Sequence, residues 1–457
     1  MPRLLLINPS NEHKGLGNIQ STAFPTLNLP YLGALTPPEY NIEVIDENIE
    51  PFKFRDADIV GITAYTASAY RGYQISQMYR EKEIPTVMGG IHVSMMPDEA
   101  LNYCDTVAIG EAETVWPQIL SDFESGHLKK KYIGEWIDLK GLPIPRRDIL
   151  KNPYYKWGSI QTSRGCPMNC SFCSVTAFNG RRFRRRPLNS VIEELYQIPQ
   201  KMVMITDDNL IGYGKEDAEW TYEFFLRIIK EGIEKIFFAQ TSIQFGDDPE
   251  LLMLAAKAGV KIVFVGMESV NPDTLQSYGK NINLKRLKEK KYKELISQIR
   301  KAGILFLGAF LVGSDEEDKS VFNSILNFAQ SSKIDVLQVT KLTPLPGTRL
   351  WETLEKENRI LKQNFPEAWN DYRFSRILFK PMKMSIEEIY EGYAYLKKNF
   401  FSPWASTKRT FNTLCTMKSL TSTFIAYKFN KSYNKAFRDS DNYHYSGRFG
   451  LNKKFRI

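Results

Sequence analysis

Short apolar runs of strand length alternate with longer segments of mixed character over the first 120 residues. Turn-forming residues bound each run, and the runs lie at residues 3–9, 41–47, 57–64, 86–91 and 106–111. The segments between them, such as "TASAYRGYQISQMYREK", have the length of helices. Strands that alternate with helices predict a doubly wound parallel sheet. We therefore expect an α/β domain over residues 1–125.

A second alternating series begins at residue 157. Its six apolar runs lie at residues 158–163, 202–208, 235–243, 261–269, 304–313 and 335–344. Helix-like stretches separate these runs, so they predict a partial (β/α)6 barrel over residues 157–355. Residues 126–156, with charged "KKKYIGEW" and proline-marked "LPIPRRD", are interpreted as a linker. Residues 356–457 are predicted to be helical, most clearly at "SIEEIYEGYAYLKKNFF".

The net charge of +9 belongs to the C-terminal tail alone. Residues 401–457 hold eleven Lys or Arg and two acids, so the preceding 400 residues balance to zero. The body of the chain therefore need not be a polyanion binder. We interpret the basic tail as a solvated, partly disordered extension, with contact to anionic lipid or RNA as the alternative.

The apolar runs also bear on the compartment. None approaches the roughly 20 residues that a membrane-spanning helix needs. The N-terminus turns polar after one short run, which is typical of a buried strand and not of a signal peptide. We expect a cytoplasmic protein.

The stretch "SRGCPMNCSFCSV" places three of the five cysteines, Cys166, Cys170 and Cys173, within eight positions. An odd number of cysteines with such short spacings is unsuited to a disulfide framework and indicates a metal centre in a reducing compartment. Structural zinc normally takes four protein ligands, and no fourth is at hand because Cys104 and Cys415 are distant. Three thiolates with an open position suit a [4Fe–4S] cluster that keeps one iron free.

The C-x-x-x-C-x-x-C spacing, with Phe172 before its last cysteine, resembles the signature of the radical S-adenosylmethionine (SAM) superfamily. The resemblance implies that the three cysteines bind three irons and that the fourth iron chelates SAM. One electron from the cluster then cleaves SAM to methionine and a 5′-deoxyadenosyl radical. The resemblance also implies an external electron donor of the flavodoxin or ferredoxin type. A structural metal knuckle is the alternative.

Polar residues that end the barrel strands are the SAM-binding candidates that this resemblance implies. They are Asp207, Asp208, Gln240, Ser242, Glu268 and Ser269. Their alternative role is ordinary hydrogen bonding to loops. The basic run "RRFRRRP" at residues 181–187 offers ion-pair partners or an arginine for the SAM carboxylate, although we favour a solvated surface loop.

The order of a doubly wound domain, a radical SAM barrel and a helical tail resembles the cobalamin (B12)-binding branch of the superfamily over residues 1–400. "DIVGIT", "VMGGIHVSMMPDEAL" and "VAIGEAET" are similar to recurrent motifs of that branch. The cobalamin contacts thus implied are Thr63, Gly89, Gly90, His92, Gly110 and Glu111. Paired glycines there would let backbone approach a ligand closely.

One loop departs from the cobalamin pattern. Where methionine-synthase-like proteins carry D-x-H-x-x-G, this chain reads "NEHKGL", with Asn11 for the Asp and Leu16 for the Gly. A histidine ligand without its orienting carboxylate is weakened, so we do not expect His13 to bind cobalt. Members of the radical branch bind cobalamin without such a ligand, so the cofactor is still expected.

The resemblance implies a class B radical SAM methyltransferase, which transfers a methyl group to an unactivated carbon of a small-molecule or lipid substrate. Three alternatives are open. The first is a cobalamin-binding cyclase, ring-contracting or oxidising enzyme without net methyl transfer. The second, a methylthiotransferase, is disfavoured because residues 1–120 offer only Cys104. The third is a non-enzymatic iron–sulfur or cobalamin sensor. Nucleic acid is not an expected partner, whereas peripheral membrane contact through the basic tail would suit a lipid substrate.

Overall fold

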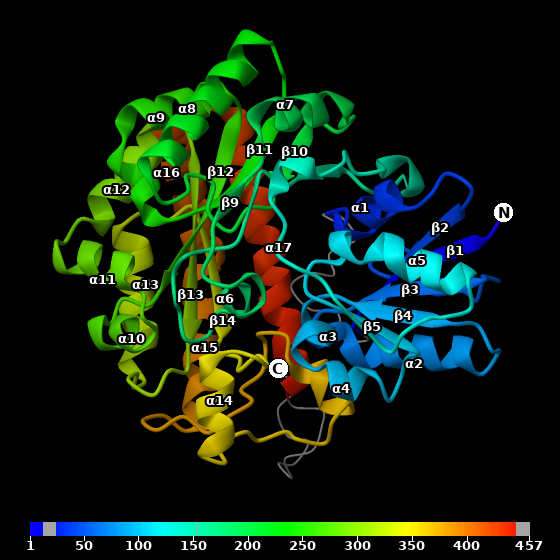
Figure 1. Cartoon of the computed structure of the whole chain (residues 1–457). Coiled ribbons are helices and arrows are strands. Elements are labelled where there is room, and N and C mark those ends of the chain that lie inside the picture. The colour runs from blue at the N-terminus through cyan, green and yellow to red at the C-terminus, as the bar shows by residue number, and fades with distance from the viewer. Residues whose placement is uncertain (12–23, 152, 445–457) are drawn as a thin grey trace.

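Two parallel β-sheets of six strands each lie side by side, and helices follow them towards the C-terminus (Figure 1). The computed structural model describes residues 1–11, 24–151 and 153–444, with side chains up to residue 435. This architecture confirms the predicted fold class, which is a doubly wound N-terminal sheet, a partial (β/α)6 barrel and a helical C-terminal extension.

The N-terminal sheet has the strand order β2-β1-β3-β4-β5-β6. Its strands are β1 (Arg3–Asn8), β2 (Asn41–Asp46), β3 (Ile59–Thr63), β4 (Thr86–Gly89), β5 (Thr106–Ile109) and β6 (Lys131–Ile133). Its helices are α1 (Asn28–Leu35), α2 (Ala69–Arg80), α3 (Ile91–Met95), α4 (Pro97–Ala100) and α5 (Trp116–Glu124). The first five strands are the predicted ones. The sixth comes from the expected linker, where only Tyr132 is buried and no apolar run marks a strand.

The barrel sheet keeps its strands in chain order, β7-β10-β11-β12-β13-β14, and every neighbouring pair is parallel. Its strands are β7 (Trp157–Ile160), β10 (Met202–Ile205), β11 (Ile236–Thr241), β12 (Val260–Glu268), β13 (Leu305–Val312) and β14 (Val336–Lys341). Its helices are α7 (Leu188–Gln197), α8 (Lys215–Lys230), α9 (Pro249–Lys257), α10 (Pro272–Ser277), α11 (Asn281–Lys288), α12 (Tyr292–Lys301) and α13 (Ser320–Ser331). The excursion after β7 contains the short antiparallel strands β8 (Ser163–Arg164) and β9 (Arg184–Arg185) with α6 (Ser174–Asn179) between them.

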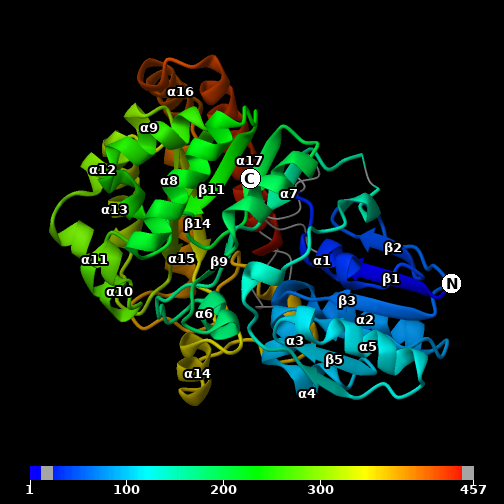
Figure 2. The same cartoon turned by 45° about the horizontal axis from the view of Figure 1, so that its top comes forward.

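The chain ends in four helices, α14 (Arg349–Lys356), α15 (Ile386–Phe400), α16 (Pro403–Met417) and α17 (Leu420–His444). The last of them, α17, lies against the barrel sheet (Figure 2). On the inner face of that sheet, Met417 of α16 and Ala426 of α17 share a core with Trp157, Ile262 and Leu305. These strand residues lie in the first halves of their strands. The helix α17 therefore closes the end of the barrel opposite to the carboxyl ends of its strands.

The helices α16 and α17 correct our interpretation of the tail as a solvated extension. A buried ion pair joins Arg300 of α12 to Asp335, at 2.9 and 3.0 Å, and Thr413 of α16 donates to the same carboxylate at 2.7 Å. Asn430 of α17 donates to the Asp335 carbonyl at 2.8 Å. Residues 403–444 are thus built onto the barrel, while residues 445–457 lie outside the described part.

The two sheets share one hydrophobic core through the segment that follows β14. Trp351 and Trp369 of this segment pack in the same cluster as Leu5, Ile62 and Met88 of the N-terminal sheet. Across residues 1–11, 24–151 and 153–444, no helix combines the length and the apolar character that a bilayer crossing requires.

A buried carboxyl group ties together the carboxyl ends of β12 and β13. Glu317 is fully buried, accepts hydrogen bonds from the backbone of Gly313 and Ser314 at 3.1 and 3.3 Å, and meets the hydroxyl of Ser269 at 2.8 Å. Burial raises its pKa to about 7 against these stabilising hydrogen bonds. The folded protein therefore favours the protonated form more than the unfolded chain does.

Glu317→Gln is expected to flatten the pH dependence of stability between pH 4.5 and pH 7. Because the folded pKa lies above the unfolded one, the native protein loses stability as pH rises through this window, by up to about 3 kcal/mol. Urea unfolding at pH 5 and pH 8 measures the difference for both proteins. An unchanged pH dependence in the variant would contradict a buried, proton-holding Glu317.

Candidate active site

The cysteine loop leaves the barrel at β8 and enters α6. Gly165 has φ +87°, and a Cβ at this position would lie 2.1 Å from the Arg182 carbonyl of the neighbouring β9 end. Only glycine fits such a close approach with a left-handed backbone. The loop then turns back so that all three cysteines come near the carboxyl ends of the barrel strands.

Contacts from three other segments hold this loop. The Gly165 amide donates to Asp208 at 3.2 Å, and the Ser171 amide donates to the Tyr278 carbonyl at 3.0 Å. Leu350 of α14 donates to the Ser171 carbonyl at 2.9 Å. Phe172 packs edge-on against the ring of Tyr278 at 4.9 Å, which gives the aromatic residue of the motif a packing role.

Groups of both charge signs surround the three thiols. Burial raises the pKa of Cys170 to about 11 and also raises that of Cys173, whereas Lys280 works in the opposite direction. The hydroxyl of Tyr213 lies 2.9 Å from the sulfur of Cys166. A cation and a hydrogen-bond donor beside thiols favour their deprotonated, metal-binding form.

This donor set fits a cluster better than a single ion. All three cysteines are free of disulfides. A mononuclear structural zinc site normally takes four protein ligands, and the loop supplies three cysteines. Three thiolates that are spread around a loop match the cysteine ligation of an iron–sulfur cluster with one open iron.

The two aspartates after β10 have separate roles. Asp207 is fully buried and accepts hydrogen bonds from the amide of Thr162 at 2.7 Å, from its hydroxyl, and from Ser163 at 2.6 Å. Asp208 is exposed on one side. The protein that surrounds the rest of its carboxyl group, together with the charge of Asp207, raises the pKa of Asp208 to about 6. Asp207 therefore anchors the strand that leads to the cysteines, and Asp208 faces the opening.

The end of β11 offers one hydroxyl without a partner. The Ser242 hydroxyl is buried and makes no hydrogen bond to any described residue, while its amide donates to Asn209 at 2.9 Å. Gln240 is half-buried on the same strand. Asn209, which also donates to the Gly212 carbonyl at 2.7 Å, links the ends of β10 and β11. Asn209 is not among the candidates that the sequence predicts, although it directly follows Asp207 and Asp208.

The end of β12 carries a strained residue. Glu268 has φ +62° at a register shift of the β12–β13 pairing, and its carboxylate accepts from Lys280 at 2.7 Å. The Glu268 carboxylate and the Cys170 sulfur outweigh the effect of burial and raise the pKa of Lys280. A non-glycine residue in this backbone region is a mark of functional sites. Ser269, in contrast, is committed to Glu317 and is not free for a ligand.

The cobalamin candidates lie at the carboxyl edge of the N-terminal sheet. Thr63 ends β3 and accepts from Asn28 at 2.7 Å, and Gly89 ends β4. Gly90 and Gly110 have φ +97° and +79°, and side chains there would strike the backbone of Ala64 and Gly134. These two glycines are therefore required by close turns of the chain itself. Thr63, Gly89, Gly90 and Gly110 all lie at the carboxyl edge of the sheet.

The backbone of His92 lies at this edge, where its amide donates to the Ala64 carbonyl, but its side chain turns into the core. Its side chain is fully buried, with Nε2 at 3.1 Å from the Tyr73 hydroxyl and 3.5 Å from Glu99, and its ring packs edge-on against Trp369. Burial lowers its pKa. The histidine is part of the core between the N-terminal sheet and the segment after β14, so we assign it a structural role. His13 lies outside the described residues.

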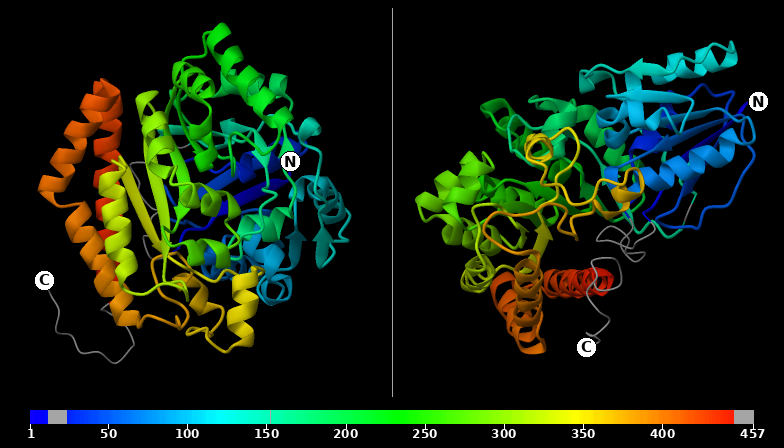
Figure 3. Two further views of the ribbon diagram at one scale, coloured as in Figure 1. Left: turned by 90° about the vertical axis from the view of Figure 1, so that its left-hand side faces the viewer. Right: turned by 90° about the horizontal axis from the view of Figure 1, so that it is seen from below.

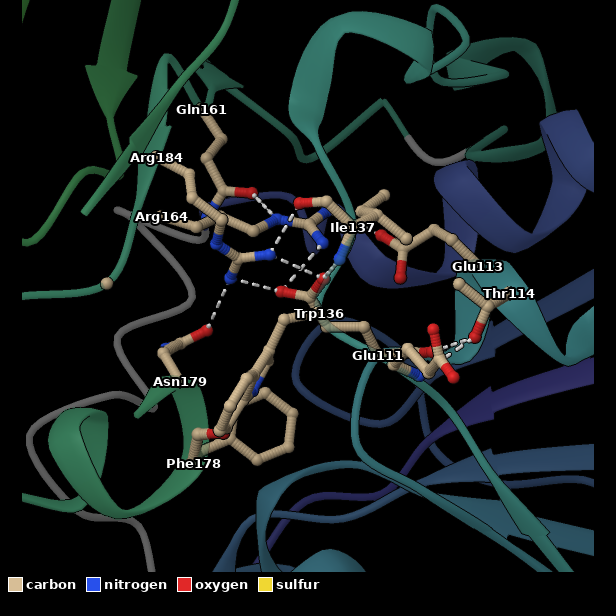
Figure 4. A network of polar contacts seen from close by, with 12 residues as sticks. Glu111, Glu113, Thr114, Trp136, Ile137, Gln161, Arg164, Phe178, Asn179 and Arg184 are labelled. Carbon is tan, nitrogen blue, oxygen red and sulfur yellow. Dashed lines mark hydrogen bonds and ion pairs between the residues drawn. The ribbon is translucent and has the colours of Figure 1, made fainter. Parts of the chain in front are cut away.

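Glu111 joins the N-terminal sheet to the strand β9 of the barrel excursion. Its carboxylate accepts two hydrogen bonds from Arg184 at 2.6 and 2.8 Å and one from the Ile137 amide at 2.9 Å (Figure 4). Arg164, directly before the cysteine loop, pairs with Glu113 at 2.5 Å and lies 3.5 Å from Glu111. Burial alone would raise the pKa of Glu111, but the two arginines outweigh it and lower the pKa.

The basic run at residues 181–187 also differs from the expected solvated loop. Arg184 is taken by Glu111, and Arg185 stacks on Phe183 and Trp220 at 5.0 and 4.4 Å. Arg186 is buried and pairs with Glu194 of α7 at 2.5 Å. Only the first two arginines of the run are exposed. Most of the positive charge of this run is thus engaged in ion pairs and ring contacts within the protein.

Family models match three consecutive parts of the chain. The B12 binding domain matches residues 28–120, the radical SAM superfamily matches residues 160–329, and a domain of unknown function, DUF4070, matches residues 348–438. The radical SAM match spans β7 to α13 and includes all three cysteines of the loop.

Two similar proteins align with most of this chain. A bacteriochlorophyllide d C-12(1)-methyltransferase of Chlorobaculum tepidum is 28% identical over 89% of this chain and 88% of its own length. An anaerobic magnesium-protoporphyrin IX monomethyl ester cyclase of Cereibacter sphaeroides is 24% identical over 89% of this chain and 72% of its own.

One solved structure shares nearly the whole fold. The radical SAM methyltransferase TsrM from Kitasatospora setae, with cobalamin and a [4Fe–4S] cluster bound, superposes with a TM-score of 0.70 at 17% identity, over 97% of this chain and 99% of that one. Together with the two domain matches and the placement of the cysteine loop, these findings give the classification. The chain carries a radical SAM domain over residues 160–329 and a B12-binding domain over residues 28–120, and it is an enzyme of the radical SAM class.

Proposed function

We propose that this enzyme is a cobalamin-dependent methyltransferase that adds a methyl group to an unactivated carbon of a small organic molecule. The observation that carries the proposal is the placement of the cysteine loop. The strands β8 and β9, which flank the loop and α6, are ion-paired to the carboxyl edge of the B12-binding domain through Arg164 and Arg184. In addition, α3 of that domain lies against α6, which follows the loop. Two cofactors at these edges would face one shared space.

Each group of residues has a defined task in this proposal. Cys166, Cys170 and Cys173 would hold the [4Fe–4S] cluster, which supplies the electron for SAM cleavage, while cobalamin supplies the methyl carrier. The exposed Asp208 and the buried Ser242 hydroxyl, which has no hydrogen-bond partner among the described residues, would bind polar groups of SAM. Glu268 and Lys280 form a charged pair beside the cysteines.

The edge of the N-terminal sheet would receive cobalamin. Thr63, Gly89, Gly90 and Gly110 mark the ends of three adjacent strands, the position at which doubly wound sheets bind ligands. A cobalamin-binding cyclase is the second candidate function, because one relative is a cyclase by name. The two functions differ in the mass of the product, since only the methyltransferase adds a methyl group.

The first test is the cofactor content after anaerobic purification and reconstitution with iron, sulfide and cobalamin. We expect about four irons and about one cobalamin per chain, with SAM cleaved to 5′-deoxyadenosine in the presence of a strong reductant. Cys170→Ala should lose the iron and the cleavage. Cys415→Ala, which removes an exposed cysteine of α16, should keep both.

Methyl transfer is followed with SAM that carries a labelled methyl group and with small-molecule extracts of the cells that make the enzyme. A product heavier by one labelled methyl supports the methyltransferase. A new product without that gain would favour the cyclase. A chain that cleaves SAM but binds no cobalamin would reduce the N-terminal domain to a scaffold and overturn the proposal.

Tyr213→Phe is expected to lower the midpoint potential of the cluster by about 40 mV. A hydrogen bond to a ligand sulfur stabilises the more negative, reduced cluster, and its loss is worth roughly 1 kcal/mol. The potential is measured by electron paramagnetic resonance at controlled potentials. Tyr222→Phe, which breaks a hydrogen bond to Asp248 away from the cysteines, is the matched control and should leave the potential unchanged. Equal potentials in both variants would refute the role of Tyr213.

The two adjacent aspartates are expected to fail in different ways. Asp208→Asn should weaken SAM binding about tenfold, because a charged acceptor is lost, and should leave unfolding unchanged. Asp207→Asn should lower the free energy of unfolding by roughly 2–4 kcal/mol, because the buried hydroxyls of Thr162 and Ser163 lose the Oδ2 acceptor, while the Thr162 amide keeps Oδ1. Equilibrium dialysis with SAM and urea unfolding separate the two effects. The opposite pattern would assign SAM binding to Asp207.

A further inference from the structure

The outward faces of α16 and α17 expose large apolar side chains in regular helical order. Trp404 and Phe411 of α16 are 77% and 64% exposed, and Leu420, Phe424 and Tyr427 of α17 are 79%, 59% and 50% exposed. These positions recur every three, four or seven residues, so on each helix they form one stripe. We call these five residues and the exposed lysines beside them the hairpin face.

The lysines of the hairpin face have no acidic neighbours in sequence. No Asp or Glu occurs between Glu391 and Asp439. Lys408, Lys418, Lys428 and Lys431 are exposed, and in the part of the chain whose side chains are described none of them forms an ion pair. The Lys428 ammonium lies 5.3 Å above the ring of Phe424. Positive charge is therefore interleaved with aromatic surface.

The opposite faces of the same helices are fully used by the fold. On α17, Ala426 and the half-buried Ile425 and Phe429 pack on the barrel sheet. On α16, Arg409 donates to Asn430 of α17 at 3.0 Å and stacks on Phe400 at 3.8 Å. Figure 3 shows the two helices together along one edge of the molecule. The hairpin is thus fixed in place and its outer side is turned to solvent.

Isolated exposed apolar residues are common on protein surfaces, but stripes of them call for a partner. A protein partner or a second copy would cover the aromatic residues but would have to supply a carboxylate for each unpaired lysine. An anionic lipid surface satisfies both features, because aromatic rings enter the interface while lysines reach the phosphates. We propose that the hairpin face docks this enzyme on the surface of an anionic lipid bilayer.

This contact would be peripheral and reversible. It uses only side chains that the fold leaves outside, so docking requires no change of the barrel. It would bring the enzyme to apolar molecules that reside in a membrane. The membrane contact does not depend on the proposed methyl transfer, since it concerns a different surface.

The test is flotation of the reconstituted full-length enzyme with vesicles of phosphatidylcholine alone or with 30% phosphatidylglycerol. We expect binding to the anionic vesicles, at least tenfold weaker binding to the neutral ones, and release by high salt. The double substitution K408Q/K428Q should weaken anionic binding by roughly 30-fold, at about fivefold per lysine. F411S/F424S should weaken it about tenfold or more.

Matched controls replace an exposed apolar residue and two exposed lysines that lie outside the hairpin face. Met253, which is 63% exposed on α9, and the exposed Lys288 and Lys290 near α11 are replaced in M253S and K288Q/K290Q, which should bind like the parent. SAM cleavage and light scattering confirm that each variant is folded and report its mass. Equal binding to both vesicle types, or loss of binding in the controls, would overturn the proposal. Two further outcomes would overturn the proposal. One is self-association of the enzyme that F411S/F424S abolishes, and the other is salt-sensitive binding of poly(U) RNA without binding to vesicles.

Discussion

The ion pairs between Glu111, Glu113, Arg164 and Arg184 bring the two sheets and the cysteine loop into one geometry. All four side chains are largely buried, so leaving any one without its partner costs about 3–5 kcal/mol. Such pairs add little net stability, but they penalise every arrangement that separates them. Arg164 immediately precedes Gly165, and the same contact that aligns the sheets therefore sets where the loop begins. A displacement of the N-terminal sheet would move the cysteines with it.

The helices and the segment that follow β14 cover the apolar surface that an open barrel leaves exposed. A sheet of six strands does not close on itself, and its inner apolar face needs a cover. The helix α17 provides it over the first halves of the strands, where Trp157, Ile262 and Leu305 lie. The segment with Trp351 and Trp369 then fills the space between barrel and N-terminal sheet. Reactive groups are thus confined to the carboxyl ends of the strands.

Acidic residues at these strand ends divide into structural and open ones. Asp207 and Glu317 are fully buried, and each is surrounded by donors from a neighbouring strand end. Asp208 is open to solvent, whereas Glu268 is buried, has a left-handed backbone and pairs with Lys280. A buried carboxyl that already accepts three hydrogen bonds from the protein has little capacity left for a ligand. In the proposed function, ligand binding therefore falls to Asp208, although both kinds of acidic residue follow the same type of strand.

The sequence by itself determined the two alternating sheets and the clustered cysteines, because burial of strands and the spacing of thiols are local patterns. It could not separate Asp207 from Asp208, or place His92 in the core, because burial at a strand end depends on what packs over it. The strand β6, with one buried side chain, left no pattern to read. The partner of Arg184 lies 73 positions away. Only the tertiary structure decided such pairings, since a charged residue is matched by proximity in space and not along the chain.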